Sequence, residues 1–457
     1  MNCEEFSLRL SRDCAVTPGM HVLAAVSGGA DSMALLCFLL EIRDAYPLHL
    51  SCVHIEHGIR EEASLEDMRF VASFCGEKHI AFYPHRVNVR AFAAREGRSL
   101  EEAARLLRHA LLQKTAEQIG ADVIALAHHR QDQAETVLLH ALRGSDIRGL
   151  CAMGYRSGNL IRPLLDVQPK ELRAYLTARG QEWREDETNG DVRYSRNRIR
   201  CKVMPELESI SAGAPGALCR LALAASRDED YFAGEIDKLG LCASILPGGA
   251  ALNRQTLEGL HPALLSRVLT RLIDAAGMEC QSARAIEEMA AVLNRGEGTV
   301  NLTDGAHACV GREFFCVYTA EPLEIDMPLA ASGVTDTPLG RFIVRRAAPG
   351  ETGDGVHAQV MPLRMLEGAR VSVRRNGDVM IPFGQHTPVK LKKLMIDAGI
   401  DRAMRRGVPV IRNGLGVVWA VGLRPGEMCR VNADDVQMIV EYCGLQKRML
   451  SAKENIR

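Results

Sequence analysis

The order of apolar and polar segments predicts an α/β domain in the first part of the chain. Short apolar runs typical of buried strands lie at 21–26, 48–55, 81–87, 122–127 and 160–165. Segments with helical periodicity lie between them, at 33–42, 64–79 and 100–119, and a further helix begins within 128–136. Strands that alternate with helices favour a doubly wound, mostly parallel sheet. In such a sheet, functional side chains collect at the carboxyl ends of the strands.

The pattern changes beyond residue 205, where Pro, Ser and Gly concentrate and indicate a domain boundary. The segment 206–325 contains a predicted linking helix, two amphipathic helices and short strands. The segment 326–457 contains alternating strands and a helix that begins near residue 389. We therefore expect a catalytic domain at 1–205 and two smaller α+β domains at 206–325 and 326–457.

The turn between the first strand and the first helix has a distinctive composition. Its residues are Ser27, Gly28, Gly29, Ala30, Asp31 and Ser32. Glycines let the backbone approach a ligand closely, and a following helix N-terminus favours phosphate. An ordinary strand-to-helix turn would not need the two hydroxyls or the carboxylate, which is a possible Mg²⁺ ligand. The spacing matches neither a P-loop with its lysine nor a dinucleotide-binding fingerprint.

A second group of polar residues follows the fourth predicted strand. It consists of His128 and His129, with Asp132 and Glu135 on one face of the helix that follows. Acidic residues at a helix N-terminus also compensate the helix dipole and cap the backbone. Capping alone does not explain this combination beside a phosphate loop, so we favour a functional role.

Basic residues are concentrated in two segments. Residues 193–202 include Arg193, Arg196, Asn197, Arg198 and Arg200, a pattern that favours contact with RNA phosphates. Lys392 and Lys393 lie in a basic helix near the C-terminus and are a second candidate RNA contact. A solvated helix face and solubilising lysines are the alternative interpretations. Arg108, on the helix at 100–119, could likewise project toward a polyanion or lie on a solvated face.

Composition narrows the possible cellular setting. The chain has 457 residues, a net charge of −1 and 14 cysteines without a C-x-x-C pair. A nucleic-acid partner must therefore be bound through local basic patches, and the cysteines suit a reducing cytoplasm. No targeting segment or membrane span is predicted. We expect a cytoplasmic protein and leave its oligomeric state open, with a homodimer as one alternative.

Together, the motifs indicate a family. S-G-G-A-D-S resembles the pyrophosphate loop of the PP-loop ATP pyrophosphatases. Four further motifs follow that loop in the chain: H-x-x-H-G-I-R, A-H-H-x-x-D-x-x-E-T, I-R-P-L-L and R-N-x-I-R. Over about the first 205 residues, this order of motifs resembles that of the tRNA(Ile)-lysidine synthases. Glu56, within the second motif, departs from the Asn or Asp of many relatives. The segments after 205 resemble the middle and C-terminal domains of the longer members.

The resemblance implies ATP-dependent ligation of free L-lysine to C2 of cytidine 34 in an isoleucine tRNA, through an adenylated cytidine. It implies that the loop binds ATP as substrate and that Asp31 positions Mg²⁺. By the same resemblance, Asp132 and Glu135 would bind the lysine ammonium groups, His128 would lie near the adenylate, and Arg108 would contact a phosphate. A tRNA thiolase is an alternative, although its paired cysteines are missing. A catalytically idle tRNA-binding protein is another.

Overall fold

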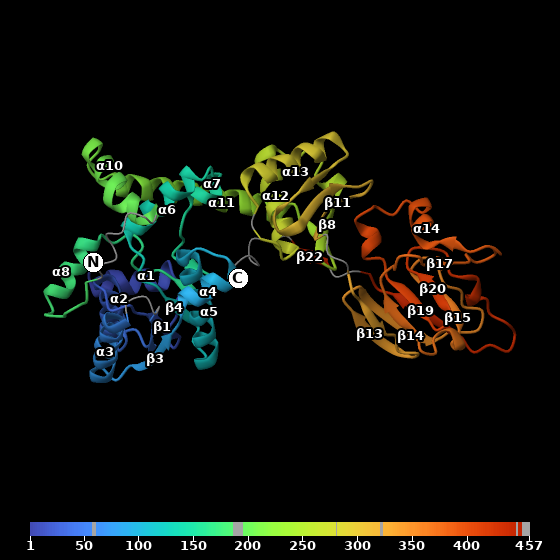
Figure 1. The fold of residues 1–457 in the computed structure, drawn as a ribbon, viewed down its shortest axis with the longest axis horizontal. Helices are drawn as coiled ribbons and strands as arrows, with labels where there is room; N and C mark the ends of the chain where they lie inside the picture. Colours follow the sequence, from blue (N-terminus) through green and yellow to red (C-terminus); the bar gives the residue numbers. More distant parts are fainter. Residues whose placement is uncertain (57–60, 186–194, 280, 320–322, 445–446, 450–457) are drawn as a thin grey trace. The chain divides into compact units, whose positions relative to one another are not determined.

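The computed structural model describes residues 1–56, 61–185, 195–279, 281–319, 323–444 and 447–449. The chain forms two compact units, Met1–Tyr231 and Phe232–Asn455, which are described separately below (Figure 1). Every cysteine within the described ranges is free. In the same ranges, no helix is long and apolar enough to cross a membrane. The predicted boundaries at 205 and 325 remain predictions.

Unit 1 is built on a six-stranded sheet in the order β3-β2-β1-β4-β6-β5. All neighbouring strands are parallel except the pair of β5 and β6 at one edge. The α/β fold with a mostly parallel sheet is therefore confirmed. The strands are β1 (His21–Ala25), β2 (His49–Glu56), β3 (Ala81–Arg86), β4 (Val123–Ala125), β5 (Arg156–Ser157) and β6 (Leu160–Ile161).

Helices cover both faces of this sheet. Within β1, Val22 and Ala24 pack into a core with Phe38 of α2, whereas Leu23 packs with Leu112 of α5 on the opposite face. Successive side chains of a strand point to opposite faces, so a strand covered on both sides must be apolar throughout. The first core includes α1 (Cys3–Arg12), α2 (Ala30–Ile42), α3 (Glu61–Glu77) and α8 (Pro169–Thr177), and the second includes α5 (Leu100–Ile119).

The other helices lie between strands in the chain or follow the last strand of the sheet, and α11 continues into unit 2. They are α4 (Val89–Glu96), α6 (Arg130–Leu142), α7 (Ile147–Leu150), α9 (Ser195–Arg198), a π-helical turn η2 (Ile199–Val203), α10 (Met204–Ile210) and α11 (Ala214–Lys238). Helix α2 begins three residues earlier than predicted. Asp31 and Ser32 are poor formers of helix interiors, but the first turn accommodates them. Asp31 is therefore presented by a helix rather than by a loop.

Unit 2 consists mainly of antiparallel sheets, as expected for the domains that follow the catalytic domain. One sheet has the order β22-β7-β8-β11-β10-β9 and packs against two helices. Its elements are β7 (Cys242–Leu246), β8 (Gly249–Asn253), β9 (Thr299–Asn301), β10 (Ala306–Val310), β11 (Phe314–Thr319), β22 (Lys447–Met449), α12 (Pro262–Ala275) and α13 (Ala283–Arg295).

The other sheets of unit 2 surround separate cores. Two have four strands, in the orders β12-β16-β19-β20 and β13-β14-β21-β15, and β17 pairs with β18. Their bounds are β12 (Asp326–Pro328), β13 (Gly333–Thr337), β14 (Gly340–Arg346), β15 (Ala358–Pro362), β16 (Arg370–Ser372), β17 (Val379–Met380), β18 (Val389–Lys390), β19 (Val410–Asn413), β20 (Gly416–Ala420) and β21 (Gln437–Tyr442). Helix α14 (Leu391–Asp397) follows β18 directly.

Candidate active site

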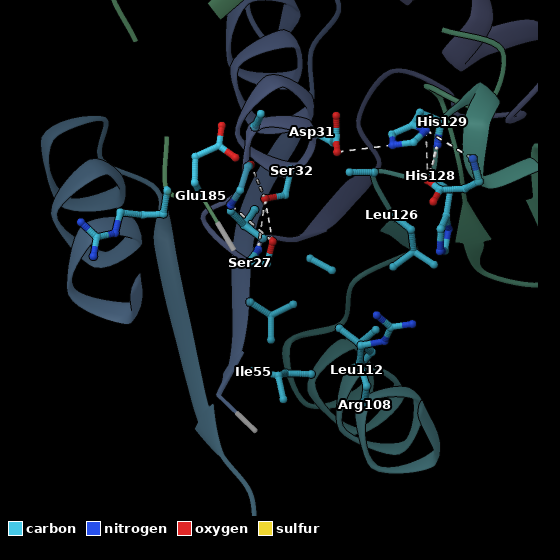
Figure 2. A pocket seen from close by; sticks show the side chains of 18 of the residues that line it. Ser27, Asp31, Ser32, Ile55, Arg108, Leu112, Leu126, His128, His129 and Glu185 are labelled. Atoms are coloured by element: carbon cyan, nitrogen blue, oxygen red, sulfur yellow. Dashed lines mark hydrogen bonds and ion pairs between the residues drawn. The ribbon is translucent and has the colours of Figure 1, made fainter. Parts of the chain in front are cut away.

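A cavity of about 420 Å³ lies in unit 1, where β1 and β4 end. Figure 2 shows Ser27 and Ser32 on one side of it and His128 and His129 on the other. The apolar side chains of Ile55, Leu112 and Leu126 also line it. The cavity therefore brings together the two polar motifs that the sequence places about 100 residues apart.

The loop after β1 depends on one glycine for its conformation. Gly28 has a φ of +94°, which side chains rarely adopt, although a Cβ there would meet Val71 at an ordinary 3.5 Å. Gly29 has an extended conformation and is the N-cap of α2, without a side-chain capping hydrogen bond. The backbone N–H groups in the first turn of α2 therefore lack a capping side chain, as an anion site requires.

Ser27 and Ser32 stabilise this loop through hydrogen bonds between its own residues. The Ser32 hydroxyl donates to the backbone oxygen of Gly29 at 2.9 Å, and the Ser27 backbone N–H donates to the Ser32 Oγ at 3.2 Å. Ser32 is buried, yet it still lines the cavity with Ser27, Gly29, Ala30 and Asp31. These hydrogen bonds shape the loop before any ligand is bound.

The segment that follows α8 makes a backbone hydrogen bond to the loop. The Arg184 backbone N–H donates to the Gly28 oxygen at 2.9 Å, and its guanidinium pairs with Asp67 and Glu66. Three charged residues that line the cavity were not predicted from the sequence: Arg173, Arg184 and Glu185. No motif spacing marks them, because only the fold brings α8 and the segment after it to the loop.

His129 connects the two polar motifs. It caps α6, and its Nε2 lies 3.4 Å from the Asp31 carboxylate while its Nδ1 lies 3.3 Å from that of Asp132. Burial lowers the pKa of His129, but the hydrogen bond to Asp31 and the charge of Asp132 outweigh burial, so its pKa is raised. Asp132 also accepts the His129 backbone N–H at 3.0 Å. Asp132 thus caps the helix, which was the alternative interpretation, and it also lines the cavity.

His128 has a different environment from its neighbour. Burial lowers its pKa to about 3, so the imidazole is neutral near pH 7. Its Nδ1 is buried and has no hydrogen-bond partner within the described part of the chain. A neutral ring with one unused nitrogen can donate to or accept from a polar group that enters the cavity.

Asp132 and Glu135 form a charge cluster with two arginines. Arg196 donates to Glu135 at 2.9 Å and to Asp132 at 3.1 Å. Arg200 donates to Glu135 at 2.6 Å and to Asp132 at 2.9 Å. Glu135 is fully buried and so does not line the cavity, whereas the other three residues do. The acids and the arginines were predicted as two separate sites, because they lie about 65 positions apart in the sequence.

The other predicted site residues lie in varied places. Arg108 extends from α5 to line the cavity. Asn197 is half-buried and Arg198 is exposed, whereas Arg193 lies outside the described residues. Lys392 and Lys393 are exposed on α14 of unit 2.

The polar residues at the end of β2 lie outside the cavity, although Ile55 between them lines it. His54 is buried, and its Nδ1 donates to the backbone oxygen of Val26 at 2.8 Å. Glu56 lies 2.9 Å from the Arg86 guanidinium. Neither residue lines the cavity, and His57 lies outside the described residues.

Comparison with known proteins identifies the class of the first unit. The profile of the PP-loop domain matches residues 4–207. The profile described as the TilS substrate C-terminal domain matches residues 369–438. With its parallel sheet and glycine loop, the first unit is a PP-loop ATP-binding domain.

Full-length relatives identify the family. A tRNA(Ile)-lysidine synthase from Geobacter sulfurreducens is 32% identical over 444 residues, which cover 93% of each chain. Those named alike from Caldanaerobacter subterraneus and Dehalococcoides mccartyi are 28% and 29% identical, over 92% and 97% of this chain and 93% and 99% of theirs. The chain belongs to the tRNA(Ile)-lysidine synthase family, whose members are ATP-dependent ligases. This confirms the family inferred from the motifs.

Proposed function

We propose that this chain ligates L-lysine to C2 of cytidine 34 in an isoleucine tRNA with a CAU anticodon, through an adenylated cytidine. The family supports the overall reaction. The observation that carries the proposal is a single cavity lined by the phosphate loop and by Asp132 of the acidic pair. A ligase that activates one substrate with ATP and then adds an amine requires both in one place.

The loop side of the cavity suits ATP. The N-terminus of α2 at Gly29 would hold phosphate oxygens through backbone N–H groups, with Arg108 as a further cation. The apolar side chains of Ile55, Leu112 and Leu126 offer a surface for a nucleobase. The cytidine O2 would attack the α-phosphorus, and pyrophosphate would leave.

Asp31 fits a Mg²⁺ ion that arrives with the nucleotide. Its carboxylate is 37% exposed in the first turn of α2, beside the phosphate loop. Within the described ranges, no group of three or more His, Cys, Asp or Glu residues could hold a metal. Mg²⁺ is commonly held by one or two carboxylates and substrate phosphates, so one carboxylate is enough. The ion would neutralise charge on the departing pyrophosphate.

The acidic side of the cavity suits lysine. Asp132 and Glu135 would bind its ammonium groups, and the neutral His128 would lie near the adenylate. A carbonyl oxygen is a poor leaving group, whereas AMP is a good one. The lysine nitrogen, after loss of a proton, would bond to C2 while the C2–O2 bond breaks and AMP departs with that oxygen.

The test is to incubate the full chain with ATP, Mg²⁺, labelled lysine and unmodified tRNA. We expect lysine on the RNA, one AMP and one pyrophosphate per lysine, and none of these products without tRNA. Entry of labelled sulfur instead of lysine would identify a thiolase. Entry of neither label, with RNA still bound, would identify an idle binding protein.

A further inference from the structure

The cluster of Asp132, Glu135, Arg196 and Arg200 leaves no carboxylate oxygen without a donor. Glu135 Oε1 accepts from Arg200, and Glu135 Oε2 accepts from both arginines, at 2.9 and 3.0 Å. Asp132 Oδ1 also accepts from both arginines, and its Oδ2 accepts the His129 backbone N–H. A lysine ammonium entering this site would find that every carboxylate oxygen already accepts at least one hydrogen bond.

The charges of the cluster are balanced as well. Two carboxylates and two guanidinium groups sum to zero, so a further cation would gain little while both arginines remain. Burial raises the pKa of Asp132, but the charges of His129 and Arg196 outweigh burial and lower it, so this carboxylate stays ionised. A lysine ammonium and the two guanidinium groups would therefore compete for the same two carboxylates.

The two arginine side chains can move out of the cluster, because they are partly exposed and Glu135 is not. Their side chains are 32% and 28% exposed, whereas that of Glu135 is 0% exposed. Both line the cavity that contains the phosphate loop. They lie four residues apart, on α9 and the π-helical turn η2, so they face the same side. Guanidinium groups bind phosphate in the same bidentate manner as carboxylate, which makes a phosphate an adequate new partner.

We propose that Arg196 and Arg200 occupy the lysine subsite until phosphate groups of the other substrates draw them away, which couples lysine binding to those substrates. The inference rests on the proposed function, because it takes Asp132 and Glu135 as the ammonium ligands. The phosphate belongs either to the RNA backbone or to ATP. In both cases, lysine gains its subsite only after a phosphate has entered the cavity.

Such an exchange makes three quantitative predictions. Couplings between binding sites typically change affinity by about 5- to 150-fold. We expect the phosphate ligand to lower the lysine dissociation constant by a factor in this range. Coupling is reciprocal, so lysine should tighten binding of the same phosphate ligand by the same factor. If that ligand is RNA, each released arginine adds a phosphate contact, and lysine should steepen the salt dependence by roughly 0.7 to 0.9 per contact.

The experiment measures lysine affinity by equilibrium dialysis of labelled lysine against the full chain in four conditions. These are protein alone, with α,β-methylene-ATP and Mg²⁺, with unmodified tRNA, and with both. We expect weak binding to the protein alone and binding at least about 5-fold tighter in one or both arms with a single phosphate ligand. The arm that produces the gain identifies the phosphate as that of the nucleotide or of the RNA.

Substitution of one arginine tests the exchange itself. Arg200→Gln removes a competing cation, so it should tighten lysine binding to the protein alone and reduce the gain from the phosphate ligand. Arg220→Gln makes the same change at an exposed residue of α11 and should alter neither value. Because Arg200→Gln leaves Glu135 with one partner and could unfold the chain, Arg196→Lys provides a second variant. It keeps the charge but loses the bidentate fork, and we expect the same direction of change.

Equal lysine affinity in all four conditions would overturn the proposal. So would weaker binding by folded Arg200→Gln without a phosphate ligand, because the arginine would then be part of the lysine site. If either result occurs while wild type still incorporates lysine into tRNA, only the exchange fails. If lysine neither binds in any condition nor enters tRNA, the proposed function fails and the exchange fails with it.

Discussion

Two basic groups look alike in the sequence and differ in the structure. Arg196 and Arg200 of unit 1 line a cavity and donate to Asp132 and to the buried Glu135 behind it. Lys392 and Lys393 of unit 2 are exposed on α14, and neither forms an ion pair with any described residue. Both groups were predicted to contact RNA on the same ground, namely local positive charge. A basic run therefore does not reveal whether its charges already have partners.

The difference has energetic consequences. Removing one member of a buried charge cluster leaves a desolvated partner, which typically costs about 3 to 5 kcal/mol. The electric field of an exposed lysine passes through solvent, and dissolved salt largely screens it beyond about 8 Å at physiological ionic strength. Substitutions in the cavity should therefore change chemistry strongly, whereas substitutions on α14 should change only RNA affinity. Four predictions test this contrast.

The largest effect is expected at Asp31. Asp31→Ala should lower tRNA-dependent release of pyrophosphate by roughly 10²- to 10³-fold, the usual cost of losing one group that stabilises developing charge. Release is measured with a coupled phosphate assay. Asp44→Ala removes an exposed carboxylate just after the same helix and should leave the rate unchanged. Near-normal release by Asp31→Ala would contradict its role with Mg²⁺.

Glu135 should separate the two chemical steps. Glu135→Gln removes a charge that the proposal assigns to lysine, so lysine transfer should fall about 10- to 150-fold, the value of hydrogen bonds to a charged group. Adenylation should fall less, because the phosphate loop does not contain Glu135. Single-turnover assays of each step give the two rates, and Glu117→Gln on the surface of α5 is the control. Equal losses in both steps would argue against a lysine subsite.

His128 should affect the pH dependence of stability. Its folded pKa of about 3 lies below the unfolded value of about 6.5, so the unfolded chain binds the extra proton between these values. This contribution is complete above pH 6.5 and is lost as pH falls, at up to about 1.4 kcal/mol per pH unit. Denaturant unfolding of His128→Gln between pH 4 and 7 should show a flatter dependence than wild type. His109→Gln, an exposed residue of α5, should retain the wild-type slope, and an unchanged slope in His128→Gln would refute a neutral buried His128.

The smallest effect is expected on α14. The double substitution Lys392→Gln and Lys393→Gln should weaken tRNA binding only a few-fold and reduce the salt slope by roughly 0.7 to 0.9 per lost contact. Stability should change by less than about 0.5 kcal/mol, as is usual at the surface. Filter binding at several salt concentrations gives both binding values. An unchanged affinity at low salt would show that these lysines serve solubility instead.

The fold was largely predictable because its signals are local. The apolar runs that became β1 and β4 are buried on both faces, and Ser99 caps α5 where the sequence placed a helix start. Helix α2 began earlier than expected, since its first turn carries Asp31 and Ser32 instead of apolar residues. Periodicity detects the apolar part of a helix more readily than its polar end.

The site was predictable only in its parts. Local motifs identified the loop at Ser27 and the acids Asp132 and Glu135. The pairing of those acids with Arg196 and Arg200 was missed, because it joins residues from distant segments through the fold. Arg184 was not predicted either. Its contact with Gly28 is a backbone hydrogen bond between distant segments, and such a bond has no sequence signature.

The central claim is that ATP activates the RNA and not the amino acid, and one measurement tests it most directly. Wild-type protein is incubated with unmodified tRNA, Mg²⁺ and ATP labelled at the α-phosphorus, first without lysine. The account predicts that the label becomes attached to the RNA and leaves as AMP when lysine is added, while Glu135→Gln retains it longer. Label that never joins the RNA and joins lysine instead would contradict the account.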